Sequence, residues 1–192
     1  MFTNQSNNEV NGDLVAGDKV DSRVTTVINV PLNSAASEEL SKLYEKLKAD
    51  GIGDPSGGGF SEKLEHYMSA LTDGDVRGLE AKLRESGRED LLHMALGLKE
   101  RAFKSIMKYQ TSRTAQRVFT IILGDLHSKF ILTVTPIIQQ GADRVAVDQC
   151  INAIIQATRD VLGENVLEFD AMDLLGLLYY LGGNCHIRWD KC

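Results

Sequence analysis

The chain ends in the stretch Gly176-Leu-Leu-Tyr-Tyr-Leu-Gly-Gly-Asn-Cys-His-Ile-Arg-Trp-Asp-Lys-Cys192, which decides how its fold is interpreted. The first half continues an apolar helix that Asp170 is placed to cap and that ends at Gly182 and Gly183. The second half brings the only tryptophan, Trp189, close to an Asn-Cys-His triplet. This combination has two interpretations: a nucleophilic Cys-His pair, or a turn that closes a helical core.

Helical periodicity extends upstream from this stretch to about residue 34. The spacing of apolar residues predicts helices over 37–49, from Ser61 to about Leu71, around 79–83, over 88–109, from 114 to about 135, over 144–162 and from Asp170 to Gly183. Pro136 predicts an end or a kink near Thr135. We therefore expect a mainly α protein, a bundle of about six or seven helices, with a short N-terminal β-rich arm.

The N-terminal residues have a different pattern. Gly-Asp occurs at 12–13 and again at 17–18, and the β-branched run 24–30 has strand character. Two or three such strands cannot stand alone in water, so identical segments from several protomers are expected to associate. There are two alternatives: the strands pack on the helical body, or the segment is a polar tail in which the Gly-Asp spacing arose by chance. The expected oligomer interface is formed by Val10, Leu14, Val15, Val20, Val24, Val27, Ile28 and Val30.

A glycine-rich stretch divides the chain. Residues 51–59 contain five glycines and a proline, and no Gly-Lys-Ser/Thr follows them, which indicates a linker rather than a phosphate loop. The expected organisation is an oligomerisation arm over 1–33, a helix and linker over 34–59, and a helical domain over 60–192.

Composition limits the class of protein. The 192 residues, 43% of them apolar, are enough for one core, and the net charge of −6 gives no broad attraction for nucleic acid or anionic lipid. Neither a signal peptide nor a run of ~18 uninterrupted apolar residues is present. Three widely spaced cysteines are typical of reduced thiols. We expect a cytoplasmic protein without membrane contact.

The tail chemistry argues against an active site. Cys185 and His186 are adjacent, so in an extended chain their side chains point to opposite sides. Zinc held by Cys185, His186 and Cys192 would have only three donors. No catalytic residue, cofactor or metal is predicted. The favoured interpretation is structural: Cys185 as a buried thiol, the His186 imidazole hydrogen-bonded to the backbone, and Trp189 closing the core.

The remaining chemistry-bearing side chains have ordinary explanations. The other histidines, His66, His93 and His127, are each expected on a helix among charged neighbours, and Cys150 is expected as a small core side chain. Basic residues gather over 99–117, but acidic residues interrupt them and no aromatics alternate with them, which favours a solvated helix face. These basic residues are Lys99, Arg101, Lys104, Lys108, Arg113 and Arg117.

Several motifs resemble the helical C-terminal domain of prokaryotic ABC-three-component systems, of which the Lamassu type is one. They are Gly-Arg-Glu-Asp-Leu at 87–91 with the lysine-rich helix after it, Ala-Gln-Arg-Val-Phe at 115–119, and Leu-Leu-Tyr-Tyr-Leu-Gly-Gly-Asn-Cys-His-Ile-Arg-Trp at 177–189. The resemblance covers about residues 60–190. Its most specific part contains Asn184, Cys185, His186 and Trp189, which we call the C-terminal signature.

The resemblance implies an adaptor in an anti-phage or anti-plasmid system. In that family the domain is usually fused behind an effector and works with a middle component and an SMC-like ABC ATPase. Fewer than sixty residues precede the helical body here, too few for an effector. We therefore expect a non-enzymatic assembly module that self-associates through its N-terminal strands and docks a protein partner through the helical body. The alternatives are a small hydrolase or nuclease using Cys185 or His186, and a weak nucleic-acid-binding protein using the basic face over 99–117.

Overall fold

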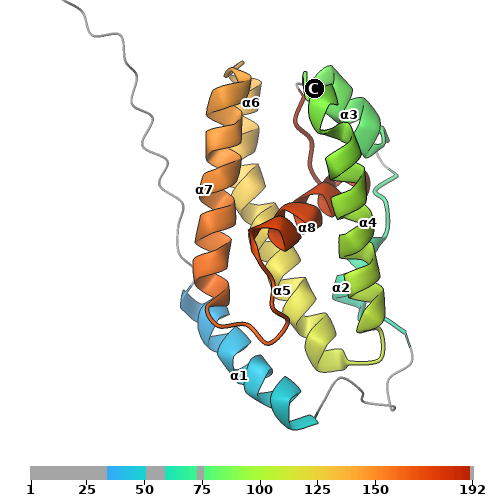
Figure 1. Cartoon of the computed structure of the whole chain (residues 1–192), viewed down its shortest axis with the longest axis vertical. Helices are drawn as coiled ribbons and strands as arrows, with labels where there is room; N and C mark the ends of the chain where they lie inside the picture. The colour runs from blue at the N-terminus through green and yellow to red at the C-terminus, as the bar shows by residue number, and fades with distance from the viewer. Residues whose placement is uncertain (1–33, 51–58, 73–75, 191–192) are drawn as a thin grey trace, which may run out of the picture.

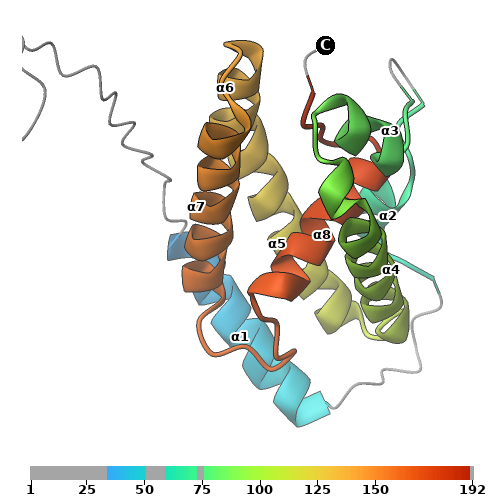
Figure 2. The same ribbon diagram turned by 45° about the horizontal axis from the view of Figure 1, so that its top comes forward.

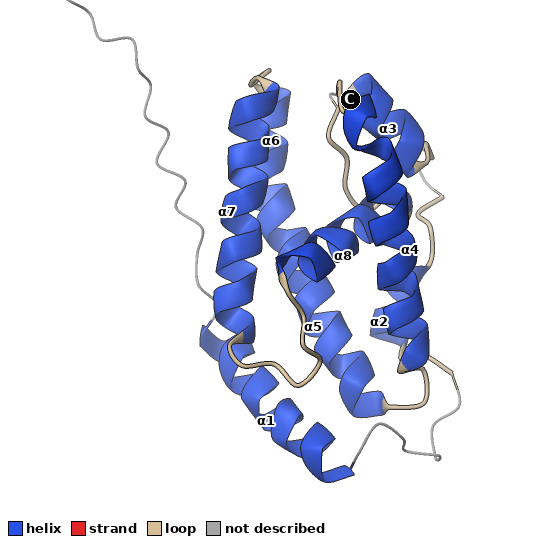
Figure 3. Ribbon diagram, viewed as in Figure 1, coloured by secondary structure: helices blue, strands red, loops and turns tan. Residues whose placement is uncertain are grey.

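The computed structural model describes residues 34–50, 59–72 and 76–190. Within these ranges the chain forms helices and no strand (Figure 3). The elements are α1 (Ser34–Asp50), α2 (Glu62–Met68), α3 (Leu79–Glu85), the 3-10 turn η1 (Glu89–Leu91), α4 (Leu92–Lys108), α5 (Arg113–Lys129), the π-helical turn η2 (Phe130–Val134), α6 (Thr135–Gln139), α7 (Arg144–Leu162) and α8 (Ala171–Gly183). Counted with α5, η2 and α6 as one bent helix, these are seven helices, which confirms the predicted helical bundle. The predicted β-rich arm lies outside the described residues.

Helix α8 occupies the middle of the bundle. It crosses between the α3–α4 side and the α6–α7 side, with α5 behind it (Figure 1). Its most extensive contacts are with α4, and it also contacts α3, α5 and α7. Almost every residue from Leu174 to Gly182 is buried, as expected for a helix that is apolar on all sides. The predicted Asp170 cap is confirmed, because Asp170 and Asp173 form a reciprocal capping box.

Helix α1 lies across the lower end of α5 and α7, a placement that is clear in the rotated view (Figure 2). The apolar positions that predicted this helix, Leu40, Tyr44 and Leu47, are buried in the shared core. Helix α7 has the bounds that the sequence predicts, and Cys150 is buried on it as expected. Gly163 ends α7 with φ 55°, a backbone conformation that favours glycine.

The helix that begins at Arg113 changes its winding before Pro136. The prediction of a distortion near Thr135 is confirmed in kind, but the distortion begins at Phe130 and takes the form of a π-helical turn. Proline has no N–H and its ring clashes with the carbonyl four residues earlier, so the preceding turn widens. Thr133 Oγ1 also donates to the Lys129 carbonyl at 2.6 Å within this turn.

The continuous run from Arg113 to Gln139 is long and apolar enough to cross a membrane by length and composition. In this fold it is a core helix, with contacts to α1, α2, α7 and α8. A buried cluster also fixes it to α7: Lys129 Nζ lies 2.6 Å from Asp125 Oδ2, and Thr158 Oγ1 donates to the same oxygen at 2.7 Å.

Helix α2 is shorter than predicted. It ends at Met68, so Leu71 lies beyond it and is exposed. Ser61 occupies the N-cap position as predicted, but its hydroxyl accepts no capping hydrogen bond. The buried side chain of Gln116 holds this segment instead, because its Oε1 accepts from Ser61 N at 2.9 Å and its Nε2 donates to the Gly59 carbonyl at 3.1 Å.

Candidate interaction site

The C-terminal signature begins where α8 ends, and Asn184 ties that end to α2. Asn184 Nδ2 donates to the carbonyls of Tyr67 and Met68, at 2.9 and 3.3 Å. The Asn184 carbonyl in turn accepts from Leu71 N at 3.1 Å. Since these carbonyls belong to the last turn of α2, the Asn184 amide replaces partners that a helix end lacks. Asn184 therefore has a structural role.

A buried lysine closes the C-terminal end of α8. Lys82 on α3 is 1% exposed, and its Nζ donates to the carbonyls of Gly182 and Ile187 at 2.7 and 3.1 Å. Burial lowers the pKa of Lys82, while Cys185 and Asp190 nearby act in the opposite direction. A cationic donor at a helix C-terminus satisfies free carbonyls and opposes the helix dipole. The role of Lys82 could not be predicted from the sequence, because a lysine on a short amphipathic helix has no distinguishing pattern.

Trp189 closes the core, as predicted. Its ring is 4% exposed and contacts Phe130 and Tyr179, with ring centroids 5.7 and 5.6 Å apart. The ring also lies directly on Gly182, where a Cβ would come within 2.5 Å of Trp189 Cζ3. Glycine at 182 is thus required by the tryptophan that follows it seven residues later.

Three of the four histidines belong to one aromatic cluster. The ring of His186 lies 5.1 Å from His66, 5.7 Å from His127 and 5.4 Å from Tyr67, measured between centroids. The prediction that His66 and His127 lie on helices is confirmed, but their ring contacts with Tyr67 and His186 were not predicted. These residues come from α2, α5 and the segment after α8, and only tertiary packing brings them together.

His186 is the buried member of this cluster. We expected its imidazole to hydrogen-bond the backbone, but neither ring nitrogen makes a hydrogen bond of normal geometry. Burial lowers the pKa of His186, and His127 and His66 lower it further, whereas the carbonyls of Tyr67 and Ser69 act in the opposite direction. Burial also lowers the pKa of His127, whose Nε2 lies 3.2 Å from the His186 carbonyl oxygen. The environment thus favours neutral imidazoles.

Cys185 is placed differently from the expectation of a buried thiol. It is half-buried, its backbone has φ 64°, and its Sγ lies 3.5 Å from the Arg77 carbonyl oxygen. The contacts of the adjacent His186 ring are with His66, His127 and Tyr67. Among the described residues, no group of three or more His, Cys, Asp and Glu side chains is placed to hold a metal ion. Cys192 lies outside the described residues.

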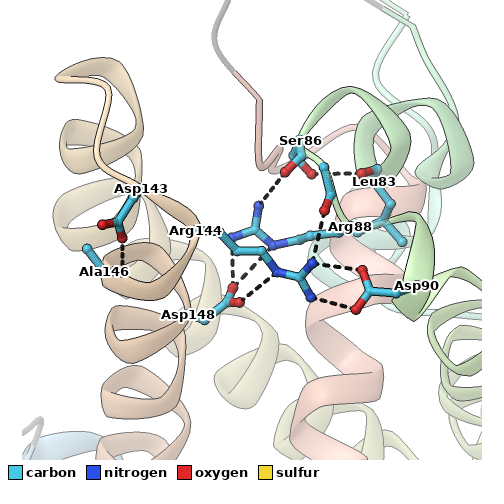
Figure 4. A network of polar contacts seen from close by, with 9 residues as sticks. Leu83, Ser86, Arg88, Asp90, Asp143, Arg144, Ala146 and Asp148 are labelled. Atoms are coloured by element: carbon cyan, nitrogen blue, oxygen red, sulfur yellow. Dashed lines mark hydrogen bonds and ion pairs between the residues drawn. The ribbon is translucent and has the colours of Figure 1, made fainter.

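Charged side chains connect the two sides of the bundle near the α3–α4 turn (Figure 4). The buried Arg88 donates through Nη2 to Asp148 Oδ1 on α7 at 2.7 Å, and through Nη1 to the Ser86 carbonyl at 3.1 Å. Arg144 on α7 forms a bidentate pair with Asp90, both distances being 2.8 Å. This pair lowers the pKa of Asp90. The network fixes α7 against the start of α4.

The basic face over 99–117 is largely occupied by intramolecular contacts. Arg101 pairs with Asp173 at 2.6 Å, and Arg117 pairs with Glu39 at 2.6 Å. Lys104 pairs with Glu100, Lys108 lies over the Tyr109 ring, and Arg113 donates to Gln116. Lys99 lies along Gly183 at the end of α8. The basic residues are therefore distributed among several partners rather than presented as one track.

A groove lies between α2, α4 and α8. It has a volume of about 500 Å³, and we call it the α4 groove. Its lining combines apolar side chains with one amide and two charges: Met68, Leu96, Lys99, Glu100, Phe103, Tyr180 and Asn184. Leu96 and Phe103 are each more than 40% exposed beside it.

The sequence matches the model of a known protein family. The family model for C-terminal domain 9 of the ABC-three component (ABC-3C) systems matches residues 78–189, more than half of the chain. The chain belongs to this family. It is therefore a component of an ABC-three-component system, a defence-type system with several protein components, and this confirms the resemblance seen in the sequence. Comparisons with curated proteins and with solved structures give no match.

The C-terminal domain 9 match runs from Gly78 to Trp189, and so from the start of α3 through the signature. Helices α1 and α2 precede it. The contacts of Asn184 and His186 with Tyr67 and His66 therefore join the family domain to a segment upstream of the matched residues. The expected interface residues Val10, Leu14, Val15, Val20, Val24, Val27, Ile28 and Val30 lie outside the described residues.

Proposed function

We propose that this chain is a non-enzymatic assembly module of its ABC-three-component system, acting in the cytoplasm. The proposal rests on the structural roles of the residues in the C-terminal signature. Asn184 caps α2, Trp189 fills the core, and the His186 ring lies in a buried aromatic cluster. A multi-component system requires contacts between its proteins. Because the distinctive residues of this chain maintain its fold, we infer that the chain contributes such contacts rather than catalysis.

A hydrolase or nuclease that uses Cys185 or His186 is the less favoured alternative. A catalytic thiol needs a base that is free to accept its proton, but Cys185 Sγ donates to the Arg77 carbonyl. The amine beside it, Lys82 Nζ, is buried and already donates to the carbonyls of Gly182 and Ile187. Burial of the His186 ring nitrogens also leaves them without access to a substrate. The nucleic-acid alternative is weakened by the intramolecular ion pairs of Arg101, Lys104 and Arg117.

The surface that we assign to a protein partner lies on the hairpin formed by η2, α6 and α7, which projects at one end of the molecule (Figures 1 and 2). Three large apolar side chains are exposed there: Leu132 by 70%, Val145 by 64% and Ile131 by 45%. We call them the hairpin patch. Ile131 and Leu132 belong to the π-helical turn, a feature that occurs frequently at functional sites. Large apolar side chains that stay exposed on one hairpin are candidates for a protein interface.

The test is co-purification of the full chain with the ABC ATPase and the middle component of its own system. We expect Leu132→Glu with Val145→Glu to abolish recovery of the partner that the wild type retains. The matched control is Met172→Glu, an exposed apolar residue near the start of α8, where an acidic side chain suits the helix dipole. Equal recovery with the patch variant and the control would overturn the assignment of the hairpin patch.

Self-association through the N-terminal residues is the second part of the proposal. It is supported by the β-branched run over 24–30 and by the repeated Gly-Asp pairs in the sequence. We expect Val24→Asp with Val27→Asp in the full chain to lower the oligomer mass measured by light scattering. A wild-type chain that is monomeric at micromolar concentration would contradict self-association.

A further inference from the structure

Helix α2 covers part of the C-terminal signature. His66 and Tyr67 on this helix place their rings 5.1 and 5.4 Å from the ring of His186, measured between centroids. Asn184 Nδ2 donates to the last carbonyls of α2, and the Asn184 carbonyl accepts from Leu71 N in the segment that follows. Two of the four signature residues therefore contact α2 or the residues just after it, and α2 lies upstream of the family-matched residues.

Helix α2 depends on tertiary contacts for its structure. It has only seven residues, Glu62–Met68, and isolated helices shorter than about 12 residues are marginal in water. Its N-cap residue, Ser61, makes no side-chain capping hydrogen bond. Leu64 is buried in the core, and Gln116 holds the residues that precede the helix. Short peripheral segments of this kind open at a lower free energy than a central helix such as α8.

The contact between α2 and the signature contains a buried imidazole without hydrogen bonds. His186 is 7% exposed, and both of its ring nitrogens are buried with no hydrogen-bond partner. A neutral imidazole has one donor and one acceptor, and here neither is satisfied. A protonated ring would bury a charge and two unsatisfied donors, at a larger cost. The closed arrangement of α2 over His186 is therefore compatible with the neutral ring only.

No nearby acidic side chain compensates a positive charge on His186. The titratable and charged groups that other elements place on His186 or on its neighbour Ile187 come from α2, α5 and α3, and they are His66, Tyr67, His127 and Lys82. None of these four carries a negative charge near neutral pH. The carbonyls of Tyr67 and Ser69 favour the protonated ring, but burial, His127 and His66 together outweigh them and lower the pKa of His186.

From these observations we propose that α2 is a pH-dependent switch: protonation of the His186 ring releases α2 from the C-terminal signature while the rest of the bundle stays folded. Among the described residues, two of the three rings in contact with His186 belong to α2, so release of this helix gives the imidazole access to water. Met68 and Asn184 both line the α4 groove, so release also widens that groove. This regulation goes beyond the proposed function, which assigns no movement to α2.

The sign of the pH dependence follows from the burial of His186. Its pKa lies below the ordinary value of 6.5 in the closed form and returns toward that value when α2 is released. The closed form is therefore fully stable above about pH 6.5 and loses stability as the pH falls below it. One histidine can raise the opening constant by up to about tenfold between pH 7.5 and pH 5.5.

Hydrogen exchange of the full chain at pH 7.5 and pH 5.5 tests the switch, with rates expressed as protection factors to remove the intrinsic effect of pH on exchange. We expect protection over 62–71 to fall by up to about tenfold at the lower pH, while the amides of α8 keep theirs. His186→Phe retains a ring and is expected to remove most of this change. His93→Phe, at an exposed position on α4, is the matched control and is expected to behave as the wild type does.

Three results contradict the switch. The first is a wild-type chain in which protection over 62–71 does not change with pH. The second is an equal loss of protection in the wild type and in His186→Phe. The third is a simultaneous loss over α2 and α8, which indicates global unfolding rather than release of α2. The amides of α8 also report, in the same experiment, whether the His186→Phe chain is folded.

Discussion

Lys82 Nζ lies 2.7 Å from the carbonyl oxygen of Gly182, so a side chain from α3 closes the buried end of α8. The same nitrogen donates to Ile187 on the far side of the turn. The end of α8 at Gly182 is therefore hydrogen-bonded to a residue 100 positions earlier in the sequence. The C-terminal end of α8 is held on both sides, by Lys82 from α3 and by the Trp189 ring, which lies on Gly182.

Replacing Lys82 with methionine removes the donor from two buried carbonyls and keeps most of the side-chain volume. We expect Lys82→Met to lower the free energy of unfolding by about 1–3 kcal/mol, the cost of leaving buried acceptors unsatisfied. The measurement is the midpoint of urea unfolding. Lys104→Met is the control, because Lys104 is exposed and pairs only at the surface. Equal midpoints for the two variants would show that the Lys82 contact contributes nothing.

A methyl group added at Gly182 collides with Trp189, whereas one added at Gly97 meets open space. We expect Gly182→Ala to destabilise the fold by about 1–3 kcal/mol through overpacking and to change the tryptophan emission. Gly97→Ala, inside α4, should stabilise it by about 0.4–1 kcal/mol. Thermal unfolding with fluorescence detection compares the two variants. A neutral Gly182→Ala would contradict the described contact with the tryptophan ring.

The histidine cluster makes stability depend on pH. The folded-state pKa values of His127 and His186 lie below their ordinary value of 6.5, so the unfolded chain binds more protons in that range. Their contribution is therefore complete above about pH 6.5 and is lost as the pH falls below it. We expect the midpoint of urea unfolding to decrease when the pH is lowered from 7.5 to 5. His186→Phe, which keeps a ring in place, should reduce this slope. An unchanged slope would exclude His186 as a source of the pH dependence.

The network at the α3–α4 turn contains one buried and one exposed arginine. Arg88 is 3% exposed, so we expect Arg88→Met to cost about 1–3 kcal/mol, because it removes the donor to the Ser86 carbonyl, while Asp148 is partly exposed and keeps its contact with Arg144. Arg144→Met should have a much smaller effect, since Arg144 is exposed and its ion pairs are screened by solvent. Chemical unfolding at two salt concentrations measures both effects. A larger loss of unfolding free energy for Arg144→Met than for Arg88→Met would contradict the burial of Arg88.

Periodic features of this fold could be predicted from the sequence. Helix α7 has the predicted bounds because its inward apolar positions, Asp143 at its start and Gly163 at its end all act locally. The Asp170 capping box is local in the same way. The role of Trp189 could also be predicted, since a lone tryptophan after an apolar helix usually completes a core.

Features that depend on tertiary contacts could not be predicted. Lys82 is buried because Gly182 and Ile187 present carbonyls to it, and nothing in the α3 sequence indicates this. His66 and His127 belong to different helices, 61 residues apart in the sequence, so their convergence on His186 follows only from the packing of α2 against α5. The position of the π-helical turn depends on how the helix accommodates Pro136 within the core.

We propose that the C-terminal signature maintains structure and performs no chemistry. The most direct test is the defence activity of the complete three-component system carrying Cys185→Gly with His186→Phe. Glycine suits the positive φ at 185 and removes the thiol, and phenylalanine preserves the ring contacts at 186. We expect this variant to fold and to protect the host as the wild type does. A variant that folds and binds its partners but gives no protection would contradict the claim.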